Sequence, residues 1–142
     1  MHLTQDVKTS LKNAAPVNST VQPLLSVANL SIDAGQQVLV QDLNFDLYAG
    51  QTLAIVGESG SGKSISSLAL LGLLPQSLKV GGQVFLNQQS LLGLNEHQWR
   101  QIRGKKIAMI FQEPMTALNP LHKVEKQIGE MLRFNGMSKA QV

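Results

Sequence analysis

The sequence of 142 residues contains no cysteine, which excludes disulfides, thiolate metal sites, cysteine nucleophiles and thiol redox switches. Charged residues are also few, at 15%, whereas 43% of the residues are hydrophobic, so the composition favours a folded domain over a disordered chain. The longest apolar run, Leu68 to Leu74, is much shorter than the ~20 residues that a membrane span needs. The composition therefore predicts a soluble, cytosolic chain that is a single domain or a piece of a larger one.

The charge is unevenly distributed along the chain. Residues 1–62 carry two lysines and five acidic residues, a balance of −3, whereas residues 63–142 carry ten basic and four acidic residues, a balance of +6. The net charge of +3 is too small to indicate a nucleic-acid surface, so no nucleic-acid partner is expected. The polar, proline-containing stretch 1–23 lacks the apolar segment of a secretory signal, and we expect it to be a flexible leader.

Apolar periodicity predicts strands and helices from residue 24 onward. Strands are expected over 24–32, 38–47, 53–56, 84–86 and 107–111. The runs 53–56 and 107–111 are continuous, which is typical of strands buried on both faces. Helices are expected over 65–74, 95–103 and 124–134, with Pro75 ending the first, Asn95 capping the second and Asn135-Gly136 ending the third. Ser138 is expected to begin another helix.

A phosphate-binding motif lies between the strand 53–56 and the helix that follows it. The residues are Gly57, Glu58, Ser59, Gly60, Ser61, Gly62, Lys63 and Ser64, which fit G-x-x-x-x-G-K-[ST] in full. The glycines allow successive backbone amides to converge on anionic oxygens, and the helix adds its positive N-terminal end. Lys63 is expected to contact the β- and γ-phosphates, and the Ser64 hydroxyl to bind Mg²⁺. The motif predicts a nucleoside triphosphate site; the alternative is a glycine-rich turn that binds nothing.

The segment Ile107–Pro120, with the sequence I-A-M-I-F-Q-E-P-M-T-A-L-N-P, resembles the Q-loop of ABC-transporter nucleotide-binding domains. Its form is similar to that of the bacterial dipeptide, oligopeptide and microcin C importer ATPases. The stretches 49–53, 82–87 and 103–104 agree with the same family, so the resemblance runs from about Leu24 to the end. It implies an α/β fold of the ABC-ATPase type, in which an incomplete P-loop NTPase core follows an N-terminal antiparallel β-subdomain.

The resemblance also implies ligands and partners. Gln112 is expected to reach Mg²⁺ and the attacking water, so that ATP and Mg²⁺ are bound by Gly57–Ser64 together with Gln112. Residues 113–121 are expected to contact the coupling helix of a membrane permease. A second ABC ATPase domain is expected to complete a dimer, located in the cytoplasm and peripheral on the inner face of the bacterial plasma membrane.

Hydrolysis in this family needs three further motifs that the sequence does not contain. They are an apolar strand ending in Asp-Glu, an L-S-G-G-Q signature and a switch histidine. The run 107–111 followed by Gln112-Glu113 mimics the first, but a neutral Gln stands where Asp would hold the metal. The segment 80–83, Val-Gly-Gly-Gln, echoes the second but precedes the Q-loop and is interpreted as a turn. We therefore expect 24–142 to be the N-terminal part of such a domain, with weak or absent hydrolysis on its own.

Two alternatives stay open at this point. A small P-loop kinase would explain the phosphate motif and the short length, although it would not explain F-Q-E-P-M-x-x-L-N-P. A truncated fragment that does not act, or acts only with a partner, would explain the missing motifs.

Two kinds of ligand contact are not indicated by the sequence. Residues 32–35 lack the aromatic ring that usually stacks on adenine in the family. His2, His97 and His122 lack the spacing of metal ligands.

Overall fold

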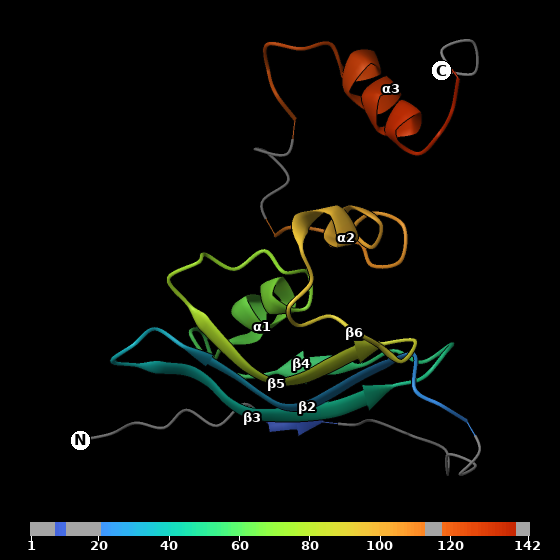
Figure 1. Ribbon diagram of the computed structural model, residues 1–142. Coiled ribbons are helices and arrows are strands. Elements are labelled where there is room, and N and C mark those ends of the chain that lie inside the picture. Colours follow the sequence, from blue (N-terminus) through green and yellow to red (C-terminus); the bar gives the residue numbers. More distant parts are fainter. Residues whose placement is uncertain (1–7, 11–20, 113–117, 139–142) are drawn as a thin grey trace. The chain divides into compact units, whose positions relative to one another are not determined.

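The computed structural model describes residues 8–10, 21–112 and 118–138, with the backbone alone for residues 8–10. The chain divides into two compact units, residues 1–107 and residues 108–142 (Figure 1). Within the described ranges, no helix is both long enough and apolar enough to cross a bilayer.

The first unit is built on a four-stranded antiparallel sheet in the order β3-β2-β5-β6 (Figure 1). Its strands are β2 (Leu25–Asp33), β3 (Val38–Leu47), β5 (Lys79–Leu86) and β6 (Gln89–Ser90). This confirms the expected antiparallel β-subdomain and the strands at 24–32 and 38–47. A separate pair of strands joins β4 (Ala54–Val56) to β1 (Lys8–Ser10) in antiparallel fashion. β1 lies within the stretch predicted to be a leader, and the sequence pattern did not predict it.

Two bulges keep apolar side chains on one face of the sheet. In β2 the buried Val27 and Leu30 are three residues apart, which is out of step with the period of two in a regular strand. Asn29 takes a φ of 51° between them, and Asp42 takes 53° at the corresponding irregularity of β3. The Asn29 side-chain amide donates to the Asp42 carboxylate at 2.6 Å. The two bulges therefore support each other and restore the inward alternation.

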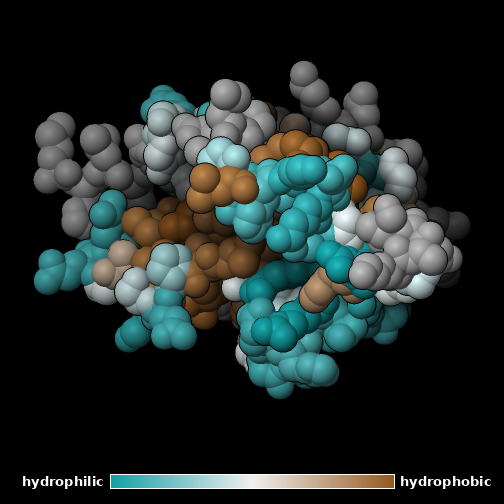
Figure 2. All heavy atoms as spheres, turned by 90° about the horizontal axis from the view of Figure 1, so that it is seen from above, coloured by the Kyte–Doolittle hydropathy of each residue, from teal (hydrophilic) through white to brown (hydrophobic). Residues whose placement is uncertain are grey.

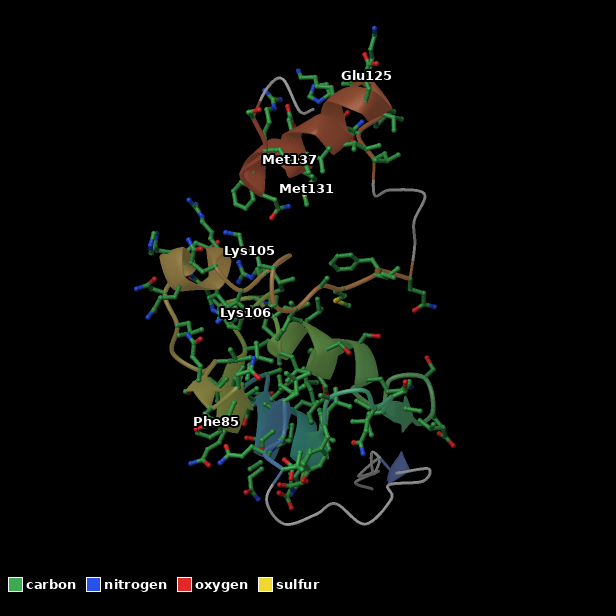
Figure 3. The ribbon with its side chains drawn as sticks, turned by 90° about the vertical axis from the view of Figure 1, so that its right-hand side faces the viewer. Phe85, Lys105, Lys106, Glu125, Met131 and Met137 are labelled. Atoms are coloured by element: carbon green, nitrogen blue, oxygen red, sulfur yellow. The ribbon has the colours of Figure 1, made fainter. Side chains whose placement is uncertain are left out.

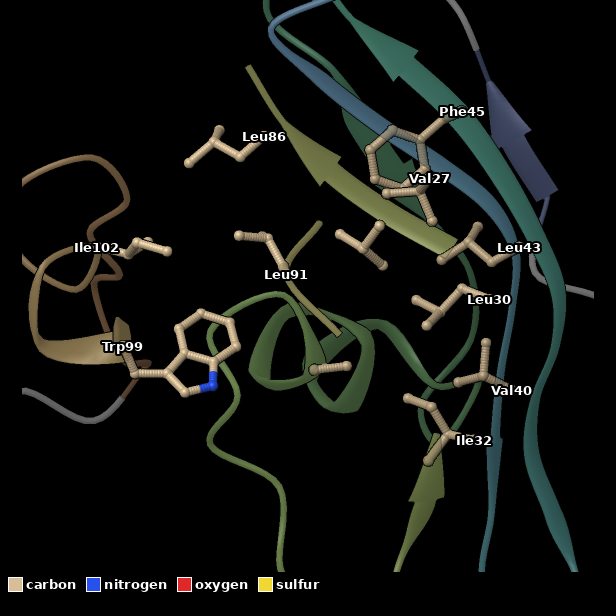
Figure 4. Packing of buried hydrophobic residues seen from close by; sticks show 12 residues of the cluster. Val27, Leu30, Ile32, Val40, Leu43, Phe45, Leu86, Leu91, Trp99 and Ile102 are labelled. Carbon is tan, nitrogen blue, oxygen red and sulfur yellow. The ribbon is translucent and has the colours of Figure 1, made fainter. Parts of the chain in front are cut away.

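The core lies between this face of the sheet and the segments that carry α1 and α2. Its strands contribute Val27, Leu30, Ile32, Val40, Leu43, Phe45, Val84 and Leu86. Ala69, Leu91, Trp99 and Ile102 complete the cluster. In Figure 4, Trp99 and Ile102 lie across from the strands of the sheet. Trp99 and Ile102 are buried, because the short helix α2 (Glu96–Arg100) presents the tryptophan inward and the following turn presents the isoleucine.

The helix α1 (Lys63–Ala69) ends earlier than predicted. The sequence placed its end at Pro75, but the chain leaves the helix through Gly72, which has a φ of 60°. The Gly72 amide donates to the Ala69 carbonyl at 3.0 Å, and the Leu73 amide donates to the Leu68 carbonyl at 3.0 Å. This pair of hydrogen bonds is the glycine-terminated helix end known as the Schellman motif. Leu73 is consequently exposed rather than buried in a longer helix.

Two further strand predictions are wrong. β4 is not buried on both faces, since Val56 is 60% exposed and β1 is its single partner among the described strands. Residues 107–111 do not form a strand, apart from one isolated bridge between Arg103 and Ile107, and Ile110 is 97% exposed. Such apolar runs become buried strands only where neighbouring strands cover them. The segment 80–83 belongs to β5 and is not a turn.

The second unit contains α3 (Val124–Phe134), with the bounds that the sequence predicted. Asn135 and Gly136 end it, and Gly136 has a φ of 95°. Met131 and Met137 lie toward one end of the helix and Glu125 toward the other (Figure 3). Apolar side chains reach the surface of the molecule as the brown areas of Figure 2. The exposed apolar residues of the second unit include Leu121, Val124, Ile128, Met131 and Phe134. The helix expected from Ser138 lies almost wholly outside the described residues.

The cap of α2 gives a first test of the fold. Asn95 accepts from the Gln98 amide at 3.0 Å, and the Gln98 side chain accepts from the Asn95 amide at 2.9 Å. Asn95→Ala removes one of these bonds and should lower the free energy of unfolding by about 1 kcal/mol. Urea unfolding followed by the fluorescence of Trp99, the single tryptophan, measures the change. Gln101 is exposed, and Gln101→Ala serves as the control, with an expected loss of unfolding free energy below about 0.5 kcal/mol. Equal losses for the two variants would contradict the role of Asn95 as a helix cap.

Candidate phosphate-binding site

The loop 57–62 joins β4 to α1 and rests on the edge of the sheet. Gly62 is the N-cap of α1 with a φ of 91°, a conformation that favours glycine. A Cβ atom at this position would lie 2.8 Å from Val40 Cγ2 and 3.0 Å from the Leu39 carbonyl oxygen. Gly62 therefore meets two requirements at once, since it supplies the backbone turn and lets the loop approach β3.

Lys63 folds back over the loop that precedes it. Its ammonium donates to the carbonyls of Gly57 at 2.8 Å and Glu58 at 2.6 Å, and to the Ser61 hydroxyl at 3.1 Å. The three contacts match the three donors of an ammonium group and connect the beginning of the loop to its end. Ser61 is buried, at 4% exposure, whereas Ser64 is exposed. The arrangement holds one positive charge against the loop.

The backbone amides of the loop provide further donors. The Ser61 amide donates to the Glu58 carbonyl at 3.2 Å. No acceptor is found in the described part of the chain for the amides of Ser59, Gly60 and Gly62. Such unpaired amides in a turn, close to a lysine, form a concave site for anionic oxygens.

A cavity of about 270 Å³ lies at this loop. Its lining combines the loop, the first turn of α1 and one residue of β3, namely Gly60, Ser61, Gly62, Lys63, Ser64, Ile65 and Leu39. The structure thus brings five of the nine predicted site residues to one cavity, and Lys63 links Gly57 and Glu58 to them. Sequence reasoning missed Leu39, because no local pattern relates a residue of the predicted strand 38–47 to the phosphate motif.

Gln112 belongs to the second unit and is exposed. Its expected role at Mg²⁺ stays a prediction.

Of the segment 113–121, residues 113–117 lie outside the described part, whereas Leu118 and Leu121 are 50% and 89% exposed. His97 and His122 are exposed, and His2 lies outside the described residues. The described residues contain no cluster of three His, Cys, Asp or Glu side chains suited to a metal ion.

The two glycines of the segment 80–83 have a structural explanation. A Cβ atom at Gly82 would lie 2.3 Å from the Asn29 carbonyl oxygen, and one at Gly81 would lie 2.7 Å from Ser31 Oγ. β5 therefore needs glycine at position 82, where its backbone passes the backbone of the β2 bulge with a φ of 94°, whereas at Gly81 the neighbouring atom is a side-chain hydroxyl. No helix begins there, which agrees with the rejection of this segment as a signature motif.

Gly60 and Gly62 form a matched pair for testing the loop. Both have a positive φ, 81° and 91°, but a Cβ atom at Gly60 would meet nothing within 4 Å. Both alanine variants incur similar backbone strain, while Gly62→Ala also collides with β3. We expect Gly62→Ala to lower the free energy of unfolding by about 1–3 kcal/mol more than Gly60→Ala. Equal losses in urea unfolding would show that the loop does not rest on β3.

Several known proteins are similar to this chain in sequence. The family model described as ABC transporter matches residues 40–142. The oligopeptide transport ATP-binding protein OppD of Escherichia coli is 47% identical over 123 residues, covering 83% of this chain and 36% of OppD. The dipeptide transport ATP-binding proteins DppD of Lactococcus lactis and Bacillus subtilis are 45% and 47% identical over 126 residues, each covering 84% of this chain.

The chain spans little more than a third of the length of these relatives, 36% to 38%. The match to the family model covers most of the chain and includes both the phosphate-binding motif and Gln112. The chain belongs to the ABC transporter family.

Proposed function

We propose that the chain binds MgATP at the loop Gly57–Ser64. The observation that supports this most directly is the position of Lys63, whose ammonium lies against the loop beside amides that find no acceptor among the described residues. A triphosphate carries several anionic oxygens, and each can accept from an amide or from the ammonium. The bonds that Lys63 makes to the Gly57 and Glu58 carbonyls are exposed, so the ammonium can exchange them for phosphate oxygens at little cost.

The proposed ligands of Mg²⁺ are the hydroxyl of Ser64 and the side-chain amide oxygen of Gln112. Ser64 lines the cavity and is exposed, so its hydroxyl is available to Mg²⁺ beside the phosphates. An oxygen donor suits this hard cation, which usually keeps several waters and binds through few protein ligands. Gln112 is proposed as a second oxygen ligand that also orients water. Bound Mg²⁺ would neutralise charge that develops on the phosphates.

The wider role proposed is that of an energy-coupling ATPase subunit of an importer for peptides or peptide-like solutes. The names of the relatives, which refer to oligopeptide and dipeptide transport, support this. Residues 113–121 would dock on a membrane permease, and the exposure of Leu118 and Leu121 suits such a contact. A second ABC ATPase domain would complete the working pair at the inner face of the plasma membrane.

Replacing Lys63 tests nucleotide binding. Lys63→Met should weaken MgATP binding by about 10-fold or more, because charge-assisted hydrogen bonds to phosphate are lost. Equilibrium dialysis of the 142-residue chain against MgATP measures the dissociation constant, and urea unfolding confirms that the variant is folded.

Lys105→Met is the matched control. Lys105 lies in the turn after α2 and contacts Gln101 at 3.3 Å, so its loss removes the same charge outside the loop (Figure 3). We expect its dissociation constant to stay within about twofold of that of the unmodified chain, since exposed charges act weakly at a distance in salt. If the folded chain takes up no MgATP, or if Lys63→Met and Lys105→Met behave alike, the proposal fails.

A further inference from the structure

The C-terminal end of α1 is held by Arg103. The Arg103 Nε donates to the Leu71 carbonyl at 2.7 Å, and Nη2 donates to the Gly72 carbonyl at 2.8 Å. The remaining terminal nitrogen, Nη1, donates to both carboxylate oxygens of Glu96 at 3.1 and 3.2 Å. The side chain of Arg103 is 24% exposed. The planar guanidinium therefore joins the helix end to α2 through all three of its nitrogens, which a lysine could not reproduce.

The ring of Trp99 packs against both the Arg103 guanidinium and the backbone of Gly72. The Arg103 guanidinium carbon lies 5.0 Å from the centroid of its ring, a cation–π distance. A Cβ atom at Gly72 would lie 2.3 Å from Trp99 Cε2, so the ring packs directly on the backbone that ends α1. Trp99 is 7% exposed. We call Glu96, Trp99 and Arg103, with the carbonyls of Leu71 and Gly72, the Arg103 clamp.

The clamp and the phosphate loop lie at opposite ends of one short helix. α1 has seven residues and therefore a length of about 10 Å. At its start, both the amide and the hydroxyl of Ser66 donate to the Gly62 carbonyl, at 2.9 and 2.8 Å. A hydrogen-bonded helix of two turns moves as one piece, so a shift of its C-terminal end displaces Lys63 at the other.

The clamp also holds the turn that leads toward Gln112 in the sequence. The Gly104 amide donates to the Ile107 carbonyl at 2.9 Å, and Arg103 forms an isolated bridge with Ile107. Arg103 thus belongs to a closed turn at the end of the first unit. The same residue restrains both this turn and the end of α1.

We propose that Arg103 is a positioning residue for the phosphate loop, and that nucleotide binding at Lys63 and the state of the Arg103 clamp are coupled. This inference rests on the proposed function, because it concerns regulation of the same site. Coupling between two sites is reciprocal. If the closed clamp increases the affinity for nucleotide, bound nucleotide stabilises the closed clamp by the same free energy. Trp99 lies within the clamp and reports its state through fluorescence.

The test compares Arg103→Gln, Arg103→Lys and the control Arg100→Gln in the full 142-residue chain. Arg100 is a suitable control because it carries the same charge on α2 and is 65% exposed, and because its 3.9 Å ion pair with Glu96 is longer than the bonds from Arg103 to Glu96, which its loss leaves in place. Each protein is titrated with MgATP below its unfolding temperature, with dialysis giving the dissociation constant and Trp99 emission giving the response of the clamp. We expect about a fivefold or larger weakening for Arg103→Gln, a smaller one for Arg103→Lys and no change for Arg100→Gln. Trp99 emission should change on binding in the unmodified chain and not in Arg103→Gln.

The outcomes separate this inference from the proposed function. No uptake of MgATP by the unmodified chain removes the proposed function and the inference with it. If the unmodified chain binds MgATP and folded Arg103→Gln binds it equally well, Arg103 contributes to stability alone and the inference is overturned. If Arg103→Gln does not fold, the affinity of Arg103→Lys decides, with an unchanged dissociation constant overturning the inference and a raised one supporting it.

Discussion

The close approach of Gly62 to β3 is the constraint on which the phosphate site depends. A side chain at this position would collide with Val40 and with the Leu39 carbonyl. Because the loop rests there, α1 begins beside the sheet, Lys63 faces back over the loop, and Leu39 becomes part of the cavity lining. The antiparallel sheet is therefore more than a neighbouring subdomain, since it forms the surface on which the phosphate loop is built.

The sheet also provides the apolar face against which the helices pack. The paired bulges of β2 and β3 turn Leu30, Val40 and Leu43 toward one face, and α1 and the α2 segment cover that face. The glycines of β5 fit against the β2 bulge rather than around a ligand. The Arg103 clamp then closes the far end of α1. The helix that carries Lys63 is thus restrained at its start by a glycine contact and at its end by a guanidinium.

Local patterns predicted the parts of the fold that local interactions determine. The alternation of 38–47, the cap at Asn95 and the helix 124–134 are set by neighbouring residues, and the structure confirms them. The end of α1 was misplaced because Gly72 was taken as a helical residue, although glycine is the usual helix terminator. The exposure of Val56 and Ile110 could not be inferred from their sequence, since burial of an apolar run depends on which strands lie beside it.

The phosphate motif was predictable because it is contiguous, whereas the place of Gln112 depends on contacts between distant segments. Membership of the ABC transporter family leaves the small P-loop kinase without support.

The phosphate site described above depends on binding of phosphate by the backbone amides of the loop 57–62. Amide proton and nitrogen NMR spectra of the 142-residue chain test it residue by residue, during titrations with MgATP and, separately, with adenosine. If the amides bind phosphate, the resonances of Ser59, Gly60 and Gly62 shift with MgATP and stay in place with adenosine, because the triphosphate supplies acceptors that these amides do not find in the described part of the chain. Shifts confined to other residues, or equal shifts with the two ligands, would contradict it.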